Sequence, residues 1–141
     1  MKSIVIYYSY TGNTKKAALE YAAQLGAEII ELKEVRRRSF FGVFFCGVPA
    51  AMSRKKAKIH PFPSDLSEYD KIIIAMPVWA GHPAPPMNNI IDILPEGKEV
   101  EVIMTSAGGD SSGSREKTTA LIAAKGCRVT EYRDIKTQKE K

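Results

Sequence analysis

Hydrophobic and polar positions follow two alternating patterns along most of the chain. Short runs rich in β-branched and aromatic residues predict buried strands at residues 3–8, 28–34, 71–76, 99–106 and 128–135. Apolar residues at helical spacing predict helices at residues 15–25, 88–94 and 115–125. The run at 71–76 is apolar on both faces, which indicates a central strand. Alternating strands and helices with short connections predict an α/β fold with a parallel sheet.

The segment between the second and third predicted strands, residues 35–62, departs from this alternation. Between two basic clusters it holds four phenylalanines, Phe40, Phe41, Phe44 and Phe45. One interpretation is a crossover whose apolar side packs on the sheet near Ala50, Ala51 and Met52. The other is a hydrophobic lip with a positively charged rim, which would contact a membrane surface or a quinone-like substrate.

The loop at residues 9–14, Ser-Tyr-Thr-Gly-Asn-Thr, lies between the first predicted strand and the first predicted helix. A helix start leaves backbone N–H groups unpaired and carries a partial positive charge, so it can bind a phosphate. Gly12 permits the tight curvature of such a cradle. The alternative is an ordinary turn with a threonine N-cap. The loop has neither the P-loop pattern of nucleotide triphosphatases nor the Gly-x-Gly-x-x-Gly pattern of dinucleotide folds.

Two further loops follow predicted strands and should lie near this one, because ligands of parallel sheets bind at the carboxyl ends of the strands. Residues 77–86 carry Trp79, the only tryptophan, beside Gly81 and four prolines. Residues 106–114 are almost all small, so their backbone can approach a flat ligand closely. A phosphate cradle, an aromatic wall and a backbone-rich loop around one crevice suit a phosphorylated planar ring.

With 141 residues, the chain has the length of one domain, residues 1–141. Its 44% hydrophobic and 26% charged residues are typical of a globular protein. Two widely separated cysteines, Cys46 and Cys127, fit a reducing compartment better than a disulfide scaffold. The first predicted strand leaves no room for a signal peptide, and no apolar stretch is long enough to span a membrane. We therefore expect a cytoplasmic protein.

The formal net charge of +5 comes from basic clusters at residues 36–38, 54–58 and 136–141. They could attract an acidic partner, an anionic substrate or nucleic acid, or they could form a solvated surface. No base-stacking aromatic motif lies among them, so nucleic acid is not the expected partner. Neither Cys/His spacing nor paired carboxylates indicate a metal site.

The three loops resemble those of the flavodoxin family, and the resemblance covers nearly the whole chain. The first-loop pattern, Ser/Thr-x-Thr-Gly-Asn-Thr, matches residues 9–14, and the second, Pro-x-Trp-x-Gly, matches Pro77, Trp79 and Gly81. The resemblance implies a doubly wound parallel sheet of five strands in the order 2-1-3-4-5, with FMN as cofactor. It places the cofactor contacts at Ser9, Tyr10, Thr11, Gly12, Asn13, Thr14, Pro77, Val78, Trp79, Ala80, Gly81, Ser106, Ala107, Gly108, Gly109 and Asp110.

By this resemblance, the first loop holds the phosphate, Trp79 stacks on the isoalloxazine ring, and the third loop meets the polar pyrimidine edge of the ring. The protein would transfer electrons through the bound flavin to a redox partner protein or a small electron acceptor, with no catalytic side chain. This is our leading hypothesis. The alternative is an FMN-dependent NAD(P)H or quinone reductase on the same fold, and a third possibility is a module that no longer uses flavin.

Three departures from the family pattern bear on this choice. In flavodoxins a peptide beside the stacking residue reorients on reduction and stabilises the one-electron-reduced flavin. Here Ala80 stands where many relatives have glycine, and a positive φ would strain an alanine. The third loop has no second aromatic, so the far face of the ring is open or is covered by Tyr10 or another residue. The chain is also basic where carrier flavodoxins are commonly acidic, which makes the reductase more plausible.

The end of the chain departs from the family as well. Flavodoxins have a helix after the fifth strand, beside the first helix, but residues 136–141 are too short and too charged to form it. The C-terminal helix is therefore expected to be missing. We expect apolar residues of the third and fourth strands on that face to meet water, and predict a homodimer or partner contact there.

Overall fold

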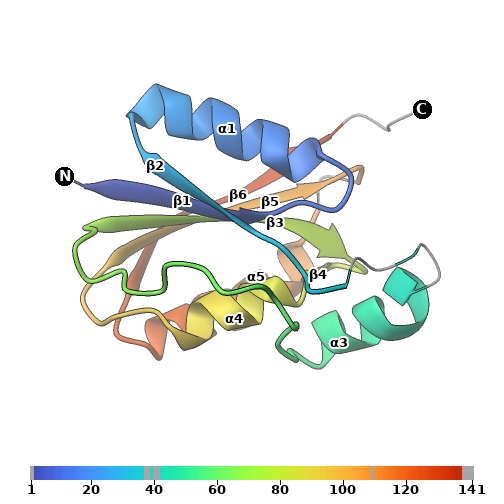
Figure 1. Cartoon of the computed structure of the whole chain (residues 1–141). Helices are drawn as coiled ribbons and strands as arrows, with labels where there is room; N and C mark the ends of the chain where they lie inside the picture. The colour runs from blue at the N-terminus through green and yellow to red at the C-terminus, as the bar shows by residue number, and fades with distance from the viewer. Residues whose placement is uncertain (1, 37–38, 40–41, 109, 138–141) are drawn as a thin grey trace.

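The sheet is the centre of the fold in the computed structural model, which describes residues 2–36, 39, 42–108 and 110–137. Five parallel strands lie in the order β2-β1-β3-β5-β6 (Figure 1). Their bounds are Ser3–Tyr8 (β1), Glu28–Leu32 (β2), Lys71–Trp79 (β3), Glu99–Ser106 (β5) and Arg128–Lys136 (β6). The short strand β4, His82–Pro83, pairs antiparallel with β3. The predicted strand order 2-1-3-4-5 is confirmed.

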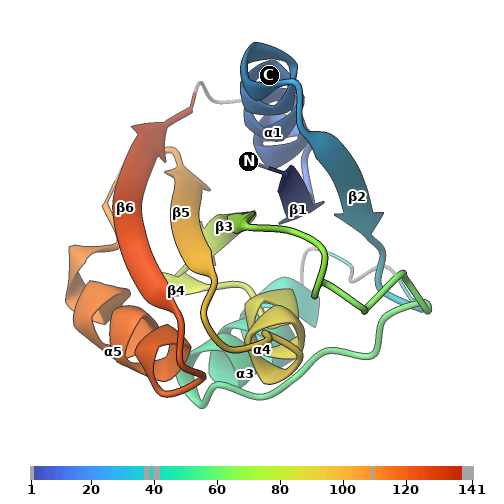
Figure 2. The ribbon, with the colours of Figure 1, turned by 90° about the vertical axis from the view of Figure 1, so that its left-hand side faces the viewer.

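Helices cover the two faces of the sheet unequally. Helix α1, Asn13–Leu25, lies on one face, and α3, α4 and α5 lie on the other (Figure 2). The bounds of these three are Val48–Met52 (α3), Pro86–Asp92 (α4) and Ser112–Ala123 (α5). A π-helical turn, η1, Val43–Gly47, precedes α3. In the described part of the chain, no helix is long and apolar enough to cross a membrane.

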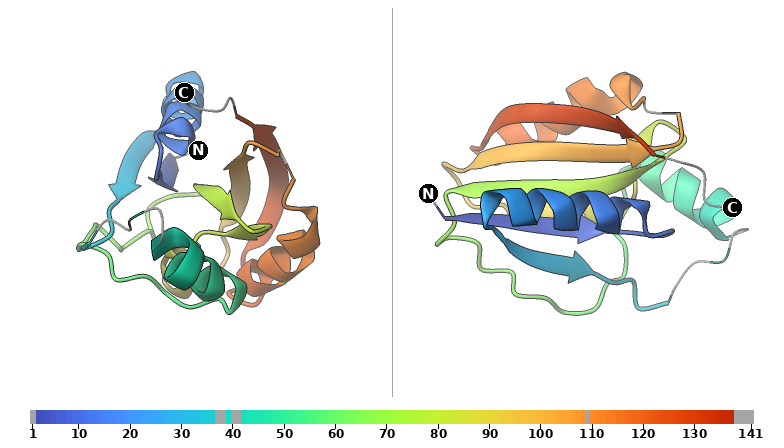
Figure 3. Two further views of the ribbon diagram at one scale, coloured as in Figure 1. Left: turned by 90° about the vertical axis from the view of Figure 1, so that its right-hand side faces the viewer. Right: turned by 90° about the horizontal axis from the view of Figure 1, so that it is seen from above.

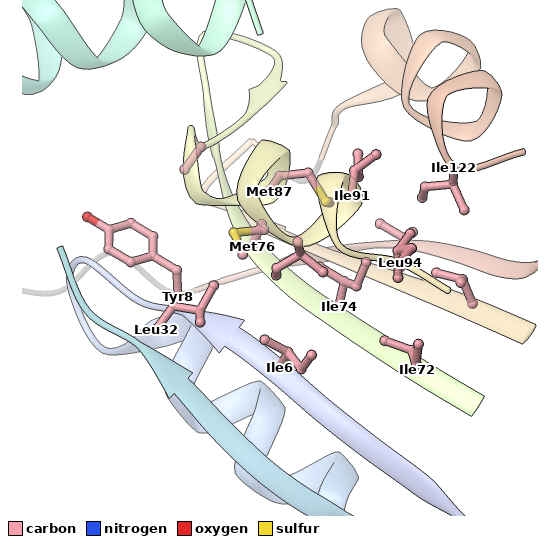
Figure 4. Close-up of a cluster of buried hydrophobic side chains, with 14 of the residues drawn as sticks. Ile6, Tyr8, Leu32, Ile72, Ile74, Met76, Met87, Ile91, Leu94 and Ile122 are labelled. Atoms are coloured by element: carbon pink, nitrogen blue, oxygen red, sulfur yellow. The ribbon is translucent and has the colours of Figure 1, made fainter. Parts of the chain in front are cut away.

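The main hydrophobic core lies between the sheet and α4 and α5 (Figure 4). Alternate residues of β3 point to opposite faces, so Ile72, Ile74 and Met76 enter this core while Ile73 and Ala75 face α1. All five side chains are fully buried. Burial on both faces explains why the sequence of β3 is uninterruptedly apolar.

Among the described residues, α1 is the only helix on its face of the sheet. Figure 3 shows that α1 runs along β1 and β3, while β5 and β6 lie to one side of the helix. β6 ends at Lys136, and residues 138–141 lie outside the described residues, so the expected absence of a C-terminal helix stays a prediction. The expectation that apolar side chains there meet water is wrong, because Ile73 and Ile103 are 0% and 1% exposed. The predicted homodimer through this face thus loses the apolar surface on which it was based, and it stays a prediction.

A charged network lies beside the apolar cluster on this face. The Glu101 carboxylate, 5% exposed, lies 2.8 Å from Lys71 Nζ and accepts a hydrogen bond from the Tyr21 hydroxyl of α1. Arg133 of β6 donates to the same hydroxyl at 2.9 Å and to Glu131. Arg133 also lies 4.7 Å over the Tyr21 ring. Side chains of β3, β5, β6 and α1 therefore join in one network that closes the sheet next to the helix.

The network keeps Glu101 ionised. Burial alone raises the pKa of a carboxyl group, but here hydrogen bonds from Lys71 and Tyr21 and the charge of Lys71 outweigh burial, and the net pKa of Glu101 is lowered. The hydrogen bond to Glu101 also raises the pKa of Lys71. Both partners are thus charged at neutral pH, and the pair depends on its geometry for its stability.

The segment at residues 35–62 has a buried residue, Ala51, and two exposed apolar residues, Phe45 and Met52. Phe40 and Phe41 lie outside the described residues. Ala51 is fully buried in the main core, which agrees with the packed crossover, but Met52 is 57% exposed. Phe45 is 74% exposed. The exposure of Met52 does not agree with the packed crossover, and the hydrophobic lip stays a prediction.

We predict that Glu101→Gln lowers the free energy of unfolding by about 2–3 kcal/mol, because Lys71 and Arg133 would keep their charge without the carboxylate that pairs with them. Denaturant unfolding measures this loss. Glu99→Gln is the matched control on the same strand, since its pair with Arg128 lies at the surface and should contribute less than about 1 kcal/mol.

The same two variants also test how the free energy of unfolding changes as the pH falls. Because the pKa of Glu101 is lower in the folded state, its contribution is complete above the ordinary glutamate pKa and is lost as the pH falls through the folded value. The stability of the wild type should therefore fall more steeply in acid than that of Glu101→Gln. Parallel acid profiles, or an equal loss in Glu99→Gln, would contradict this account.

Candidate functional site

A cavity of about 290 Å³ opens at the carboxyl ends of β1, β3 and β5. It brings together three loops that are distant in the sequence, as the sequence predicts. Its walls are formed by Tyr10, Thr11, Asn13, Thr14, Pro77, Val78, Trp79, Thr105, Ser106, Ala107 and Thr137. Nine of these are predicted contact residues, while Thr105 and Thr137 are additional. Six predicted residues belong to the same loops without lining the cavity: Ser9, Gly12, Ala80, Gly81, Gly108 and Asp110. Gly109 lies outside the described residues.

The first loop presents the start of α1 to the cavity. Gly12 is the N-cap residue, with φ 104°, a conformation that side chains with a Cβ strongly disfavour. Ser9 Oγ accepts a hydrogen bond from the Gly12 N–H at 3.0 Å and so shapes the turn. No side chain caps the helix. The alternative of a threonine N-cap is therefore wrong, and the uncapped helix start suits an anion better.

Thr14 has a different role from capping. Its hydroxyl lies 2.6 Å from the hydroxyl of Thr105 at the end of β5, and both residues are buried. This hydrogen bond joins the first turn of α1 to the strand that leads into the third loop. The only sequence signal for Thr105 is a polar residue at the end of an apolar strand, which is too common to identify a site.

Trp79 forms a rigid aromatic wall. It is 7% exposed, and its ring meets the rings of Tyr8 and Tyr10 edge to face, each at a centroid distance of 6.1 Å. The Tyr8 hydroxyl in turn donates to Glu34 Oε1 at 2.5 Å. Tyr10 therefore lies beside Trp79 on the cavity wall. Because three aromatic rings support one another, Trp79 can offer a flat surface with little loss of side-chain freedom.

The chain reverses directly after Trp79 in a two-residue turn. Ala80 has φ 51° and Gly81 has φ 79°, and the flanking residues Trp79 and His82 are paired. Two consecutive positive φ angles are typical of a type I′ hairpin turn. Alanine is strained in this conformation, by about 1–2 kcal/mol. The His82 ring nitrogen Nδ1 lies 3.0 Å from the Ala80 carbonyl oxygen.

The third loop leaves one side of the cavity bordered by small side chains. Ala107 and Gly108 are exposed, and Ser106 is half-buried. Asp110 points elsewhere, since its carboxylate accepts a hydrogen bond from the Ser112 N–H at 2.8 Å, and bonding to Ser112 lowers the pKa of Asp110. The loop thus supplies space and backbone groups to the cavity, while Asp110 supports the start of α5.

Comparison with known proteins identifies the family to which this site belongs. A sequence model described as NADPH-dependent FMN reductase matches residues 1–131 of the 141. The chain belongs to this family. A comparison with curated proteins finds no significant match.

Solved structures show the same fold. A flavoprotein from Lactobacillus acidophilus NCFM, crystallised in complex with FMN, is 25% identical with a TM-score of 0.75, over 94% of this chain and 93% of that chain. Oxidised Flavodoxin 1 from Bacillus cereus is 19% identical with a TM-score of 0.64, over 99% and 87%. A flavodoxin from Streptococcus pneumoniae TIGR4 is 15% identical with a TM-score of 0.58, over 99% and 88%. The predicted flavodoxin-like fold is confirmed.

FMN, the predicted cofactor, is confirmed by the family assignment. The residues present fit it: an uncapped helix start for the phosphate, a supported aromatic wall for the ring, and an open border of small residues. The individual contacts of the predicted residues with FMN stay predictions.

We predict that Gly12→Ala weakens FMN binding at least tenfold. With a Cβ, the Gly12 conformation costs about 1–3 kcal/mol, so the free loop should relax to another conformation, and FMN binding would have to restore the cradle. Quenching of flavin fluorescence during titration of the apoprotein measures the dissociation constant. Gly113→Ala, exposed on α5, is the matched control, because an added Cβ there meets open space and the residue is not a predicted FMN contact. Equal affinities of wild type and Gly12→Ala would contradict the phosphate cradle.

Proposed function

We propose that this protein is an FMN-dependent oxidoreductase that accepts electrons from NADPH and passes them to a small acceptor or a redox protein. The family assignment carries the proposal, since the matching sequence model is that of an NADPH-dependent FMN reductase. Bound FMN supplies the redox chemistry, because a flavin can accept a hydride and release electrons. The chain binds and orients the cofactor.

Each loop has a separate task in this proposal. The uncapped start of α1 would hold the phosphate with its backbone N–H groups. Trp79, fixed by Tyr8 and Tyr10, would pack against one face of the ring and exclude water from it. The small residues at Ala107 and Gly108 leave the opposite border open to a second planar molecule, as a nicotinamide donor requires.

A second, basic cavity supports an anionic electron donor. It measures about 700 Å³ and is lined by Arg36, Lys56 and Lys58 together with Glu34. Glu34 also accepts the hydrogen bond of Tyr8, whose ring contacts Trp79, so Tyr8 connects the walls of the two cavities. Because NADPH carries several phosphate charges, a basic wall near the flavin site would favour its approach.

The second candidate function is that of an electron carrier without its own nicotinamide reaction. The flavodoxins among the similar structures favour it. Both functions use the same FMN site and differ only in whether NADPH reacts directly with the loaded protein.

We predict that NADPH bleaches the absorbance of the FMN-loaded protein rapidly under anaerobic conditions, because the open border lets the donor reach the ring. Stopped-flow absorbance measures the rate. Reduction by dithionite serves as the control that the bound flavin is redox-active. A flavin that dithionite reduces but NADPH does not would contradict the reductase and support the carrier.

The basic cavity provides a variant for the same experiment. Arg36→Glu and Lys58→Glu should raise the NADPH concentration for half-maximal rate by roughly three- to tenfold and leave FMN affinity unchanged. Lys117→Glu, an exposed position on α5, is the matched control for net charge. Equal effects of all three substitutions would show that only net charge matters.

A further inference from the structure

Two residues other than glycine have a positive φ in the described part of the chain, Ala80 at 51° and Arg54 at 58°. They are far apart in the sequence, but Ser114 joins them. Arg54 Nη2 donates to the Ser114 carbonyl oxygen at 3.3 Å, and Ser114 Oγ donates to the Gly81 carbonyl oxygen at 2.6 Å. Ser114 thus connects the strained turn after Trp79, through its hydroxyl, to the strained residue Arg54, through its backbone carbonyl.

Hydrogen bonds at the start of α5 fix the position of Ser114. It is 2% exposed and lies in the first turn of α5, where its N–H donates to the Ser111 carbonyl oxygen at 3.0 Å. The Ser111 hydroxyl lies 2.9 Å from the Tyr132 hydroxyl and donates to Asp134 at 2.5 Å. Because Tyr132 and Asp134 belong to β6, the start of α5 is fixed to the sheet, and so is the donor to Gly81.

The backbone conformation and the burial of Arg54 are both unfavourable, and its other contacts do not explain them. Its guanidinium is partly buried, which lowers its pKa, and its Nη1 atom is buried with no hydrogen-bond partner among the described residues. Strained backbone and unpaired buried donors persist where the surroundings force them, and they are enriched at functional sites. The feature that Arg54 reaches through Ser114 is the turn beside the flavin cavity.

We propose that Ser114, supported by Arg54, is a positioning residue that holds the Ala80–Gly81 turn in its left-handed conformation and thereby sets the redox potential of FMN. Both carbonyl groups of the turn are engaged, Gly81 by Ser114 and Ala80 by His82. The turn therefore presents fixed dipoles, and a fixed Trp79, to the cavity. Dipoles and hydrogen bonds near a flavin tune its potential. The effect on the potential rests on the proposed FMN site.

The first test needs no cofactor. Trp79 is the only tryptophan and directly precedes the turn, so its near-UV circular dichroism and fluorescence report the conformation of the turn in the apoprotein. Ser114→Ala should change both signals. Adding Ala80→Gly should restore them, because glycine adopts a positive φ without strain and does not need the clamp. Ser112→Ala, exposed in the same turn of α5, is the control and should change neither.

The second test uses the FMN-loaded protein. Ser114→Ala should shift the midpoint potential, while the dissociation constant of FMN changes less than about threefold because the phosphate cradle lies on another loop. Ala80→Gly should reverse the shift, and Arg54→Met should shift the potential in the same direction by a smaller amount. A merely structural role of Ser114 predicts lower stability without rescue by Ala80→Gly.

The outcomes separate the two proposals. If the wild type does not bind FMN, the proposed function fails, and the tryptophan signals of the apoprotein still test the clamp. Unchanged signals in Ser114→Ala, or changed signals that Ala80→Gly does not restore, would overturn the clamp. A restored tryptophan signal with an unchanged midpoint potential would overturn its effect on the flavin.

Discussion

The parallel pairing of β1, β3 and β5 is the constraint on which the site depends. In this register Tyr7 lies opposite Ala75, and Pro77 opposite Thr105, so the three strands end at the same edge of the sheet. The buried hydrogen bond between Thr14 and Thr105 then joins the first loop to the third across that edge. Neither loop alone forms a cavity. The sheet, whose central strand is buried on both faces, makes their meeting point rigid.

Much of this arrangement follows from the sequence because its signals are local. The uninterrupted apolar run of β3 identifies the central strand, and the loop around Gly12 sits between a strand and a helix. Contacts between distant segments are not visible in this way. Thr105 and Thr137 belong to the cavity wall because of strand register, and the hydroxyl of Thr14 pairs with Thr105 where the pattern of a helix start also allows an N-cap.

The face of the sheet that α1 covers shows the same limit. Glu101 and Lys71 lie in apolar strands, and each charge in isolation suggests an exposed position. Only the pairing of β3 with β5 and the position of α1 bring Lys71, Tyr21 and Arg133 around the Glu101 carboxylate. The expectation of exposed apolar residues was wrong because α1 and a polar network together protect Ile73 and Ile103. On this face, hydrophobic contacts with α1 and the charged network both cover the sheet.

The turn after Trp79 connects the fold to the chemistry. An alanine in a left-handed conformation is tolerated only where neighbouring groups hold it. Here His82 contacts the Ala80 carbonyl oxygen, and Ser114 donates to the Gly81 carbonyl oxygen. The same turn carries the aromatic wall of the cavity. The cofactor site is therefore formed by a loop and a hairpin turn, and the sheet and α5 keep both of them in place.

In the site that we propose, the start of α1 binds the phosphate of FMN, and Trp79 packs against its ring. A comparison of FMN with riboflavin, which has the same ring without the phosphate, tests it most directly. Titration of the apoprotein with each flavin, followed by flavin fluorescence, should give a dissociation constant for riboflavin at least about 100-fold higher, because charge-assisted hydrogen bonds to the phosphate are lost. Equal affinity for the two flavins would contradict the account.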